Sequence, residues 1–205
     1  MRSQIRPALV CFLMLTLITG VAYPLLITAI AQLVFPHQAN GSLVLNANGK
    51  PIGSELIGQW SDDPRYFWPR PSATSPVPYS SFNGEKGTSS TGSNLAETNP
   101  ALLQAVKDRV EALHRADPSN QAPIPVDLVT ASASGLDPHL SPAAAEYQVA
   151  RVARLRAMSD NDVRSLVSQC TEGRQLGLLG EPRVNVLQLN LALDSVHPAA
   201  ALEKP

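Results

Sequence analysis

The chain has 205 residues, and its 16 Lys and Arg nearly balance its 17 Asp and Glu. The net charge of −1, without a basic patch interleaved with aromatic residues, disfavours nucleic acid as a partner. Two cysteines, Cys11 and Cys170, are too few for the disulfide framework of a small exported domain.

Residues 7–35 form a run of 29 residues without Asp, Glu, Lys, Arg or His. A helix of this length reaches about 43 Å, more than the roughly 30 Å of a bilayer core. Arg2 and Arg6 precede the run, and the next Lys or Arg is Lys50. The positive-inside rule therefore predicts a transmembrane helix over 7–35, in lipid, with a cytoplasmic N-terminus at residues 1–6.

Residues 36–205 are then predicted to form one periplasmic or extracytoplasmic domain, on a single-pass protein of the cell inner membrane. A cleaved signal peptide is the alternative, because Ala29-Ile30-Ala31 matches the small-x-small cleavage pattern. The apolar run is nearly twice as long as the upper limit of a signal peptide, so we expect an uncleaved anchor. Pro24 lies inside the run and is expected to kink the helix.

The exported region begins with signs of a β-hairpin. Ser42–Leu45 and Pro51–Ile57 are predicted to be short strands around an Asn48-Gly49 turn. Ser61–Asn94, rich in Pro, Gly and Ser, is predicted to be a long irregular loop. Loops of this length in a compact domain are usually functional or packed against something.

The next elements are predicted from capping signals and periodicity. An amphipathic helix begins at Asn99-Pro100. A short strand over Val126–Val129 leads through the small residues Ala131–Gly135 to a turn at Asp137-Pro138. Ser141-Pro142 then opens a second helix, with serine as N-cap and proline at the first helical position.

Two further elements complete the predicted α+β fold. A helix is expected from Ser159 to about Cys170, with Cys170 on its apolar stripe and therefore packed inside. Along residues 187–194 every second residue is leucine, and the leucines alternate with Gln188, Asn190, Ala192 and Asp194. This pattern predicts a half-buried strand with Leu187, Leu189, Leu191 and Leu193 on one face.

The sequence motifs that could indicate phosphate binding, metal binding or catalysis are weak. Gly84–Ser89 resembles a phosphate loop but contains Lys-Gly where Gly-Lys is required. No zinc-ligand pair is present and the four histidines are scattered, so no metal site is predicted. Asp137, His139 and Ser141 have the residue types of a serine hydrolase, but side chains on one tight turn rarely converge in that geometry. We predict no catalytic site.

The aromatic cluster Tyr66, Phe67, Trp68 and Arg70 suits a partner interface, because Trp, Tyr and Arg dominate binding hot spots. The alternative is a loop that covers the domain's own core. Of the four residues, Arg70 is the one we expect to face a partner.

Residues 125–156 closely resemble the signature of one family, the C subunits of bacterial Kdp-type, high-affinity potassium-transporting P-type ATPases. Further segments resemble the same family in the same order: 53–59, 66–73, 92–95, 99–100 and 179–187. One departure is Pro69, where the family pattern leads us to expect glycine.

The resemblance implies an accessory subunit of an ATP-driven potassium import complex. Its implied partners are a potassium-binding, channel-like subunit and a P-type ATPase subunit. This chain lacks the Asp-Lys-Thr-Gly-Thr phosphorylation motif of P-type pumps. The family is described as stabilising the assembly and raising the nucleotide affinity of the ATPase subunit, as a catalytic chaperone.

The resemblance also implies ATP contact at Ser134, Gly135 and Gln148. The predicted topology opposes direct contact, because ATP is cytoplasmic and these residues follow the anchor. We therefore expect an indirect effect, transmitted through the assembly as a coupling free energy. The alternatives are an anchored exported hydrolase that uses His139, or a periplasmic ligand-binding protein.

Overall fold

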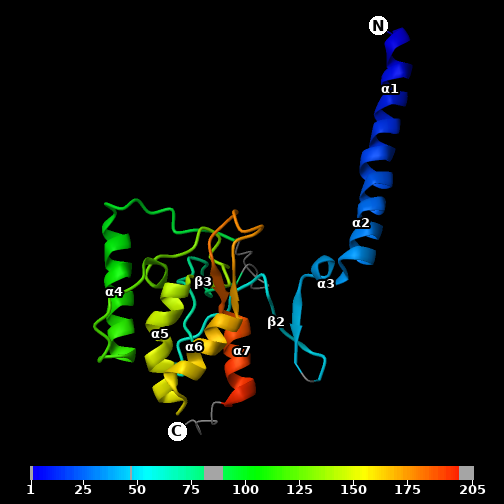
Figure 1. The fold of residues 1–205 in the computed structure, drawn as a ribbon. Coiled ribbons are helices and arrows are strands. Elements are labelled where there is room, and N and C mark those ends of the chain that lie inside the picture. Colours follow the sequence, from blue (N-terminus) through cyan, green and yellow to red (C-terminus); the bar gives the residue numbers. More distant parts are fainter. Residues whose placement is uncertain (1, 47, 81–89, 199–205) are drawn as a thin grey trace. The chain divides into compact units, whose positions relative to one another are not determined.

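A computed structural model describes residues 2–46, 48–80 and 90–198. The chain divides into two compact units, Met1–Ile52 and Gly53–Pro205, and each is described by itself (Figure 1). The division follows Ile52, so residues 36–52 belong to the same unit as the N-terminal helix. The membrane sidedness assigned to residues 1–6 and 36–205 stays a prediction.

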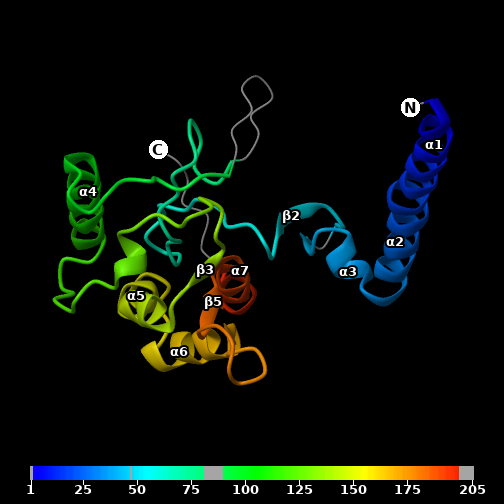
Figure 2. The ribbon, with the colours of Figure 1, turned by 90° about the horizontal axis from the view of Figure 1, so that it is seen from above.

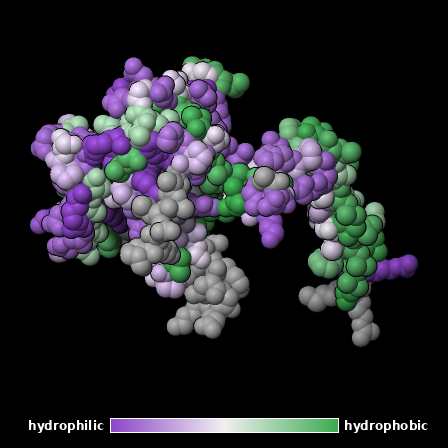
Figure 3. Space-filling view, turned by 90° about the horizontal axis from the view of Figure 1, so that it is seen from below, coloured by the Kyte–Doolittle hydropathy of each residue, from purple (hydrophilic) through white to green (hydrophobic). Residues whose placement is uncertain are grey.

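The N-terminal unit begins with four consecutive helical elements: α1 (Arg2–Leu17), the π turn η1 (Ile18–Ala22), α2 (Tyr23–Val34) and α3 (Pro36–Ala39). The 31 residues Gln4–Val34 are long and apolar enough to cross a membrane, by length and composition. Figure 3 shows hydrophobic residues covering much of this helix. The apolar helix predicted over 7–35 is therefore present.

Pro24 is accommodated by the π turn that precedes it. Proline has no backbone N–H, so it cannot donate the hydrogen bond that continues an α-helix. The N–H of Tyr23 donates to the carbonyl of Ile18, five residues earlier, instead of four. The expected disturbance at Pro24 thus takes the form of one wider turn in a continuing helix.

The predicted hairpin is confirmed as β1 (Leu43–Leu45) and β2 (Pro51–Ser54). The side-chain oxygen of Asn46 accepts hydrogen bonds from the N–H groups of Asn48 and Lys50, at 3.0 and 2.9 Å. Gly49 has a φ of +71°, which glycine adopts at little cost. The turn therefore depends on the left-handed Gly49 and on the side chain of Asn46, which the Asn-Gly signal did not include.

Four helices form the framework of the second unit: α4 (Pro100–Ala116), α5 (Pro142–Leu155), α6 (Asp160–Gln169) and α7 (Val186–Val196). Eight of the 14 residues of α5 are buried, which makes it the central core element. Helix α6 packs against α5 and α7, as Figures 1 and 2 show. Cys170, just after α6, packs against this core as predicted.

A small antiparallel sheet joins the signature turn to the C-terminal part of the chain. Its strands, in the order β3-β5-β4, are β3 (His139–Leu140), β5 (Arg183–Asn185) and β4 (Thr171–Glu172). Leu140 and Thr171 both pair with Val184, which is fully buried. The sheet therefore fixes the start of α5 beside the start of α7.

The predicted helix starts are confirmed at Asn99, Ser141 and Ser159. Each side-chain oxygen accepts a hydrogen bond from a backbone N–H two or three residues later, at 2.9–3.1 Å. These bonds satisfy donors that lack a partner inside the first helical turn. The N-terminal boundaries are thus set by neighbours in the sequence.

The strand predicted over residues 187–194 is wrong, because this segment is helix α7. Leu189 and Leu193 are fully buried and four residues apart, a spacing that suits one helix face as well as alternate strand positions. Asn185 decides the outcome locally, since its side chain accepts a hydrogen bond from the N–H of Gln188 at 3.1 Å as an N-cap. Leu187 and Leu191 are only half-buried.

The strand predicted over Val126–Val129 is also wrong. Residues Val126–Leu128 form a 3₁₀ turn, η2, which Pro125 precedes. Leu128 and Val129 are both buried although they are adjacent, which strand alternation does not allow on a one-sided sheet. By contrast, the described parts of the predicted 61–94 loop, residues 61–80 and 90–94, contain no helix or strand.

Candidate functional site

The aromatic segment beginning at Tyr66 is held against the domain's own core. The ring of Phe67 is fully buried. Its backbone N–H donates to the side-chain oxygen of Asn190 at 2.9 Å, and the Asn190 amide donates to the Phe67 carbonyl at 3.0 Å. The Tyr66 hydroxyl donates to the Asp194 carboxylate at 3.0 Å. The prediction that this segment meets a partner is not tested by these internal contacts.

Gln148 fastens the same segment to α5. Its side-chain oxygen accepts from the N–H of Trp68 at 2.8 Å and from Arg151 at 2.6 Å. Its amide nitrogen donates to the carbonyls of Trp68 and Ala144, each at 3.2 Å. The residue is 1% exposed, so both donors and both acceptor positions of this amide are used inside the domain.

Arg151, one turn further along α5, is buried with 2% exposure. It donates to the carbonyls of Pro64 and Tyr66, and its guanidinium lies 4.9 Å from the centre of the Trp68 ring. Among the described residues it forms no ion pair with a carboxylate. Burial therefore lowers the pKa of Arg151 to about 10.

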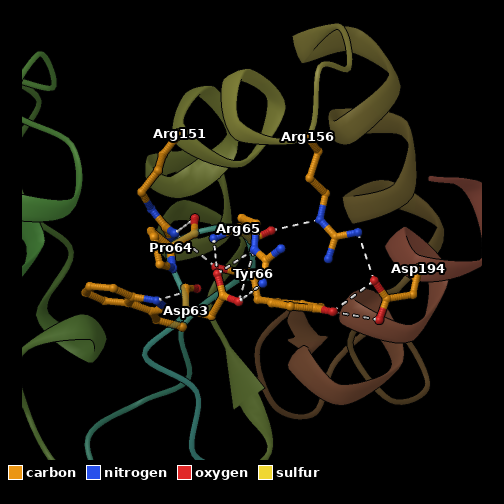
Figure 4. Close-up of polar contacts among 8 residues, drawn as sticks. Asp63, Pro64, Arg65, Tyr66, Arg151, Arg156 and Asp194 are labelled. Carbon is orange, nitrogen blue, oxygen red and sulfur yellow. Dashed lines mark hydrogen bonds and ion pairs between the residues drawn. The ribbon is translucent and has the colours of Figure 1, made fainter. Parts of the chain in front are cut away.

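Arg156 links three parts of the domain that are distant in sequence (Figure 4). It donates to the Arg65 carbonyl at 2.8 Å, to the Asp194 carboxylate at 2.9 Å and to the His197 carbonyl at 2.8 Å. Its guanidinium also lies 4.3 Å from the centre of the Tyr66 ring. The sequence patterns did not predict these roles of Arg151 and Arg156.

A sequence signal for Arg151 was present in α5. Ala144, Gln148 and Arg151 are spaced four and three residues apart, so they share one helix face. The loop residues that Gln148 and Arg151 bind lie 80–87 positions earlier in the chain and could not be identified from this spacing.

Arg70 is an internal partner of the signature turn. It forms an ion pair with Asp137 at 3.1 Å and donates to the Ala131 carbonyl at 3.4 Å. Asp137 also accepts from the backbone N–H of His139 at 3.0 Å, and its carboxylate lies 3.3 Å from His139 Nδ1. Burial by itself would raise the pKa of Asp137, but these bonds and the Arg70 charge lower it overall.

Replacing Asp137 with asparagine is expected to destabilise the fold at pH 7, by about 1 kcal/mol. A carboxyl whose pKa is lowered on folding stabilises the protein above the pKa of the unfolded chain, and this contribution disappears as the pH falls through the folded pKa. The difference from wild type should therefore be complete above about pH 5 and shrink below about pH 4.

This difference can be measured by urea unfolding of the full-length protein in detergent at pH 7, 5 and 3.5. Asp108→Asn, at an exposed carboxylate on α4, is the matched control and should change stability little at any of these values. A D137N difference that stays the same across the series would contradict the assigned role of the charge.

Asp137, His139 and Ser141 do not assemble as a hydrolase triad. The Ser141 hydroxyl accepts from the N–H of Ala144 at 3.1 Å as the N-cap of α5. The Ser141 N–H in turn donates to Asp127 at 2.8 Å. No hydrogen bond joins His139 to Ser141 within the described part of the chain, whereas a triad requires one between nucleophile and base.

Ser134 and Gly135 bind two other parts of the irregular region 61–94, at Thr91 and at Ser72. The Ser134 carbonyl accepts from the N–H of Thr91 at 2.9 Å, and the Gly135 carbonyl accepts from the Ser72 hydroxyl at 2.6 Å. Gly135 has a φ of +67°, and a Cβ there would lie 2.7 Å from the Thr91 carbonyl oxygen and 2.8 Å from the Thr74 methyl carbon. Only glycine fits this position without displacement.

Two of the three nucleotide candidates therefore hold the two ends of one segment, whereas Ser134 contacts Thr91. Gln148 binds the segment at Trp68, and Gly135 binds it at Ser72. Within the described residues, no hydrogen bond joins Gln148 to Ser134 or Gly135. The rejected phosphate-loop candidate, Gly84–Ser89, lies outside the described residues.

Comparisons with known proteins give the family. The family model described as KdpC, the c chain of K⁺-transporting ATPase, matches residues 5–195. The chain belongs to the KdpC family. The match includes the apolar helix, the signature turn and α7, so it confirms the resemblance drawn from the sequence motifs.

Three curated relatives agree with this assignment, and each is named as a potassium-transporting ATPase KdpC subunit. The relative from Sorangium cellulosum is 66% identical over 96% of this chain and 100% of its own length. The relatives from Polaromonas naphthalenivorans and Methylococcus capsulatus are 62% and 63% identical, over 98% and 96% of this chain and 99% and 100% of their own lengths.

Proposed function

We propose that this chain supports a potassium-transporting ATPase from the outer side of the membrane, without performing the chemistry itself. As a member of the KdpC family, it is an accessory subunit of the Kdp complex. Beyond this membership, we propose on which side of the membrane the C-terminal domain lies, which parts of the partner subunits it contacts, and how it affects the use of nucleotide by the ATPase subunit.

The observation that carries the proposal is the internal use of Gln148. Its buried amide already makes four hydrogen bonds, so contact with ATP would require some of them to break. Ser134 and Gly135 are similarly engaged with Thr91 and Ser72. These contacts support a role for all three residues in shaping the outer domain.

The position of Arg2 and Arg6 before the apolar helix supports an orientation with the N-terminus inside. The membrane helix would then pack against the potassium-binding, channel-like subunit. The outer domain would stabilise or cover the outer mouth of the ion path. Its effect on ATP use by the P-type subunit would be a coupling free energy between distant sites.

The hydrolase and the ligand-binding alternatives are not favoured. Ser141 serves as a helix cap and Asp137 pairs with Arg70, so the residues suggested for hydrolysis have structural partners. Both alternatives would require the soluble part to act alone, whereas a KdpC family subunit functions in a complex.

Sidedness can be tested by labelling single cysteines with a membrane-impermeant reagent that enters the periplasm, in a Cys11→Ala, Cys170→Ala background. Ala133→Cys, at an exposed position beside Ser134, should be labelled in intact cells. Gln4→Cys, near the N-terminal end of the apolar helix, should be labelled only after the inner membrane is opened. These outcomes follow from the positive-inside rule.

The same tagged chain should co-purify with a P-type ATPase subunit and a potassium-channel-like subunit. Labelling of A133C only in opened cells would reverse the orientation. It would also restore Ser134, Gly135 and Gln148 as a possible nucleotide site.

A further inference from the structure

A cavity of about 260 Å³ lies between helix α4, the turn η2 and the irregular region that begins near Trp60. Figures 1 and 2 show α4, in green, at the edge of the domain. Eight of the twelve residues that line the cavity are apolar, and they include two tryptophans and three prolines. The walls therefore suit a flat, apolar molecule. Ser134, Gly135 and Gln148 are not among these lining residues, so the cavity is separate from the nucleotide candidates.

The Trp68 ring forms a fixed wall of this cavity. Its indole N–H donates to the Asp63 carbonyl at 3.0 Å, and its backbone N–H donates to Gln148 at 2.8 Å. The guanidinium of Arg151 lies 4.9 Å from the centre of the ring. These contacts set the orientation of the ring before any ligand arrives, which reduces the entropy lost on binding.

Trp60 forms an accessible wall, since it lines the same cavity and is 54% exposed. Among the described residues, its indole N–H has no hydrogen-bond partner. Tryptophan combines a large apolar face with one polar donor, so it is suited to a ligand that has an apolar body and a polar end.

Arg109 supplies the cavity with a positive charge. The residue is half-buried, and its guanidinium donates to the Val129 carbonyl at 2.6 Å. Within the described part of the chain it forms no ion pair and no other hydrogen bond. Burial lowers the pKa of Arg109, and the charge of Asp108 offsets this only in part. Arginine nevertheless stays charged at neutral pH, so most of its donors are available to an anion.

The charges near the cavity favour an anion over a cation. Arg109 and the buried Arg151 both lack a carboxylate partner among the described residues. Asp62 also lines the cavity, but it is exposed, so water and salt weaken the effect of its charge. A carboxylate would meet a planar guanidinium that can bind both of its oxygens. ATP is a poor match, because sites for several phosphates use many backbone N–H groups or several cations.

We propose that this cavity binds a small aromatic carboxylate. In the bound state the carboxylate accepts hydrogen bonds from Arg109, and the ring packs against Trp60 and Trp68. Such a ligand joins α4 to the irregular region, so it stabilises the domain as its occupancy rises. The site goes beyond the proposed function, since it belongs to this chain alone and leaves the role of accessory subunit unchanged.

The first test titrates the full-length chain, in lipid nanodiscs, with phenylacetate. Trp60 and Trp68 are the chain's only tryptophans and both line the cavity, so binding should change their fluorescence. We expect saturable binding in the millimolar range or tighter. Phenylacetamide and phenethylamine should bind at least about ten-fold more weakly, because charge-assisted hydrogen bonds are stronger than neutral ones. Equal affinity for the three compounds, or no saturable binding of phenylacetate, would overturn the proposal.

The second test compares variants in the same titration. Arg109→Gln removes the charge and should weaken phenylacetate binding about ten-fold or more. Arg115→Gln, on the same helix, is the matched control and should bind like wild type. Arg115 is exposed, pairs with Glu111 at 3.9 Å and is not among the lining residues. Trp60→Leu should also weaken binding, and it decides the outcome if R109Q lowers the urea midpoint of the chain.

Wild-type affinity in both R109Q and W60L would refute the site. That result would leave the proposed function intact, because no other subunit is present in these titrations. Failure of the wild-type chain to co-purify with any ATPase subunit would instead refute the proposed function.

Discussion

Replacing Arg156 with alanine is expected to lower the free energy of unfolding by about 3 kcal/mol. The guanidinium holds the Arg65 carbonyl, the Asp194 carboxylate and the His197 carbonyl together. Each hydrogen bond made by a charged group contributes roughly 1–3 kcal/mol, and the acceptors left inside the domain lose their partner. The loss should exceed that of any exposed arginine in the chain.

The measurement is urea unfolding of the full-length chain in detergent, followed by the fluorescence of Trp60 and Trp68, the chain's only tryptophans. Arg164→Ala is the matched control, because Arg164 is 45% exposed and pairs with Glu146 on the surface. Exposed pairs contribute at most about 1 kcal/mol. Equal losses in the two variants would show that the contacts of Arg156 do not hold the domain together.

Replacing Gly135 with alanine is expected to destabilise the domain by about 3 kcal/mol. A left-handed φ costs an L-residue about 1–2 kcal/mol, and forcing an extra carbon into a packed site adds about 1–3 kcal/mol. Here the new Cβ would lie only 2.7 Å from a backbone oxygen of Thr91, which cannot move away as a flexible side chain could.

Two other glycines separate these contributions. Gly177 has a φ of +73° with no atom within 4 Å of a Cβ, so G177A should show the conformational cost alone, about 1 kcal/mol. Gly173 lies outside the left-handed region and is equally open, so G173A should change stability by less than about 0.5 kcal/mol. If G135A is no worse than G177A, the contacts with Thr91 and Thr74 are not tight.

The Gly135 variant also distinguishes two roles for the signature turn. A structural role predicts that G135A lowers the urea midpoint of the isolated full-length chain. A role confined to nucleotide binding predicts an unchanged midpoint and a changed dependence of ATPase activity on ATP concentration in the complex. The packing of Gly135 against Thr74 favours the first outcome.

Polar side chains of α5 and of Arg156, the residue directly after it, join the irregular loop to the core. Gln148, Arg151 and Arg156 together hold the backbone of residues 64–68 through its carbonyl and amide groups. A loop with no helix or strand has backbone groups that need such partners when they are buried. This network stabilises a domain whose cysteine, Cys170, is free.

Features that depend on near neighbours in the chain could be predicted from the amino-acid sequence. The apolar run over 7–35, the Asn-Gly hairpin and the caps at Asn99, Ser141 and Ser159 involve residues within a few positions of one another. Hydrogen bonds and periodicity at this range are local, so they could be predicted without knowledge of the fold. The ordered family motifs were equally visible in the sequence.

The partners of the buried polar groups, by contrast, depend on how distant segments of the chain pack in the folded domain. The leucines between 187 and 193 fit a strand or a helix, and packing against the core together with the Asn185 cap favours the helix. Arg156 and Asp194 are 38 residues apart, and Gln148 and Trp68 are 80 apart. A buried donor is satisfied by whichever acceptor the fold brings within about 3 Å, and sequence spacing carries no information about that distance.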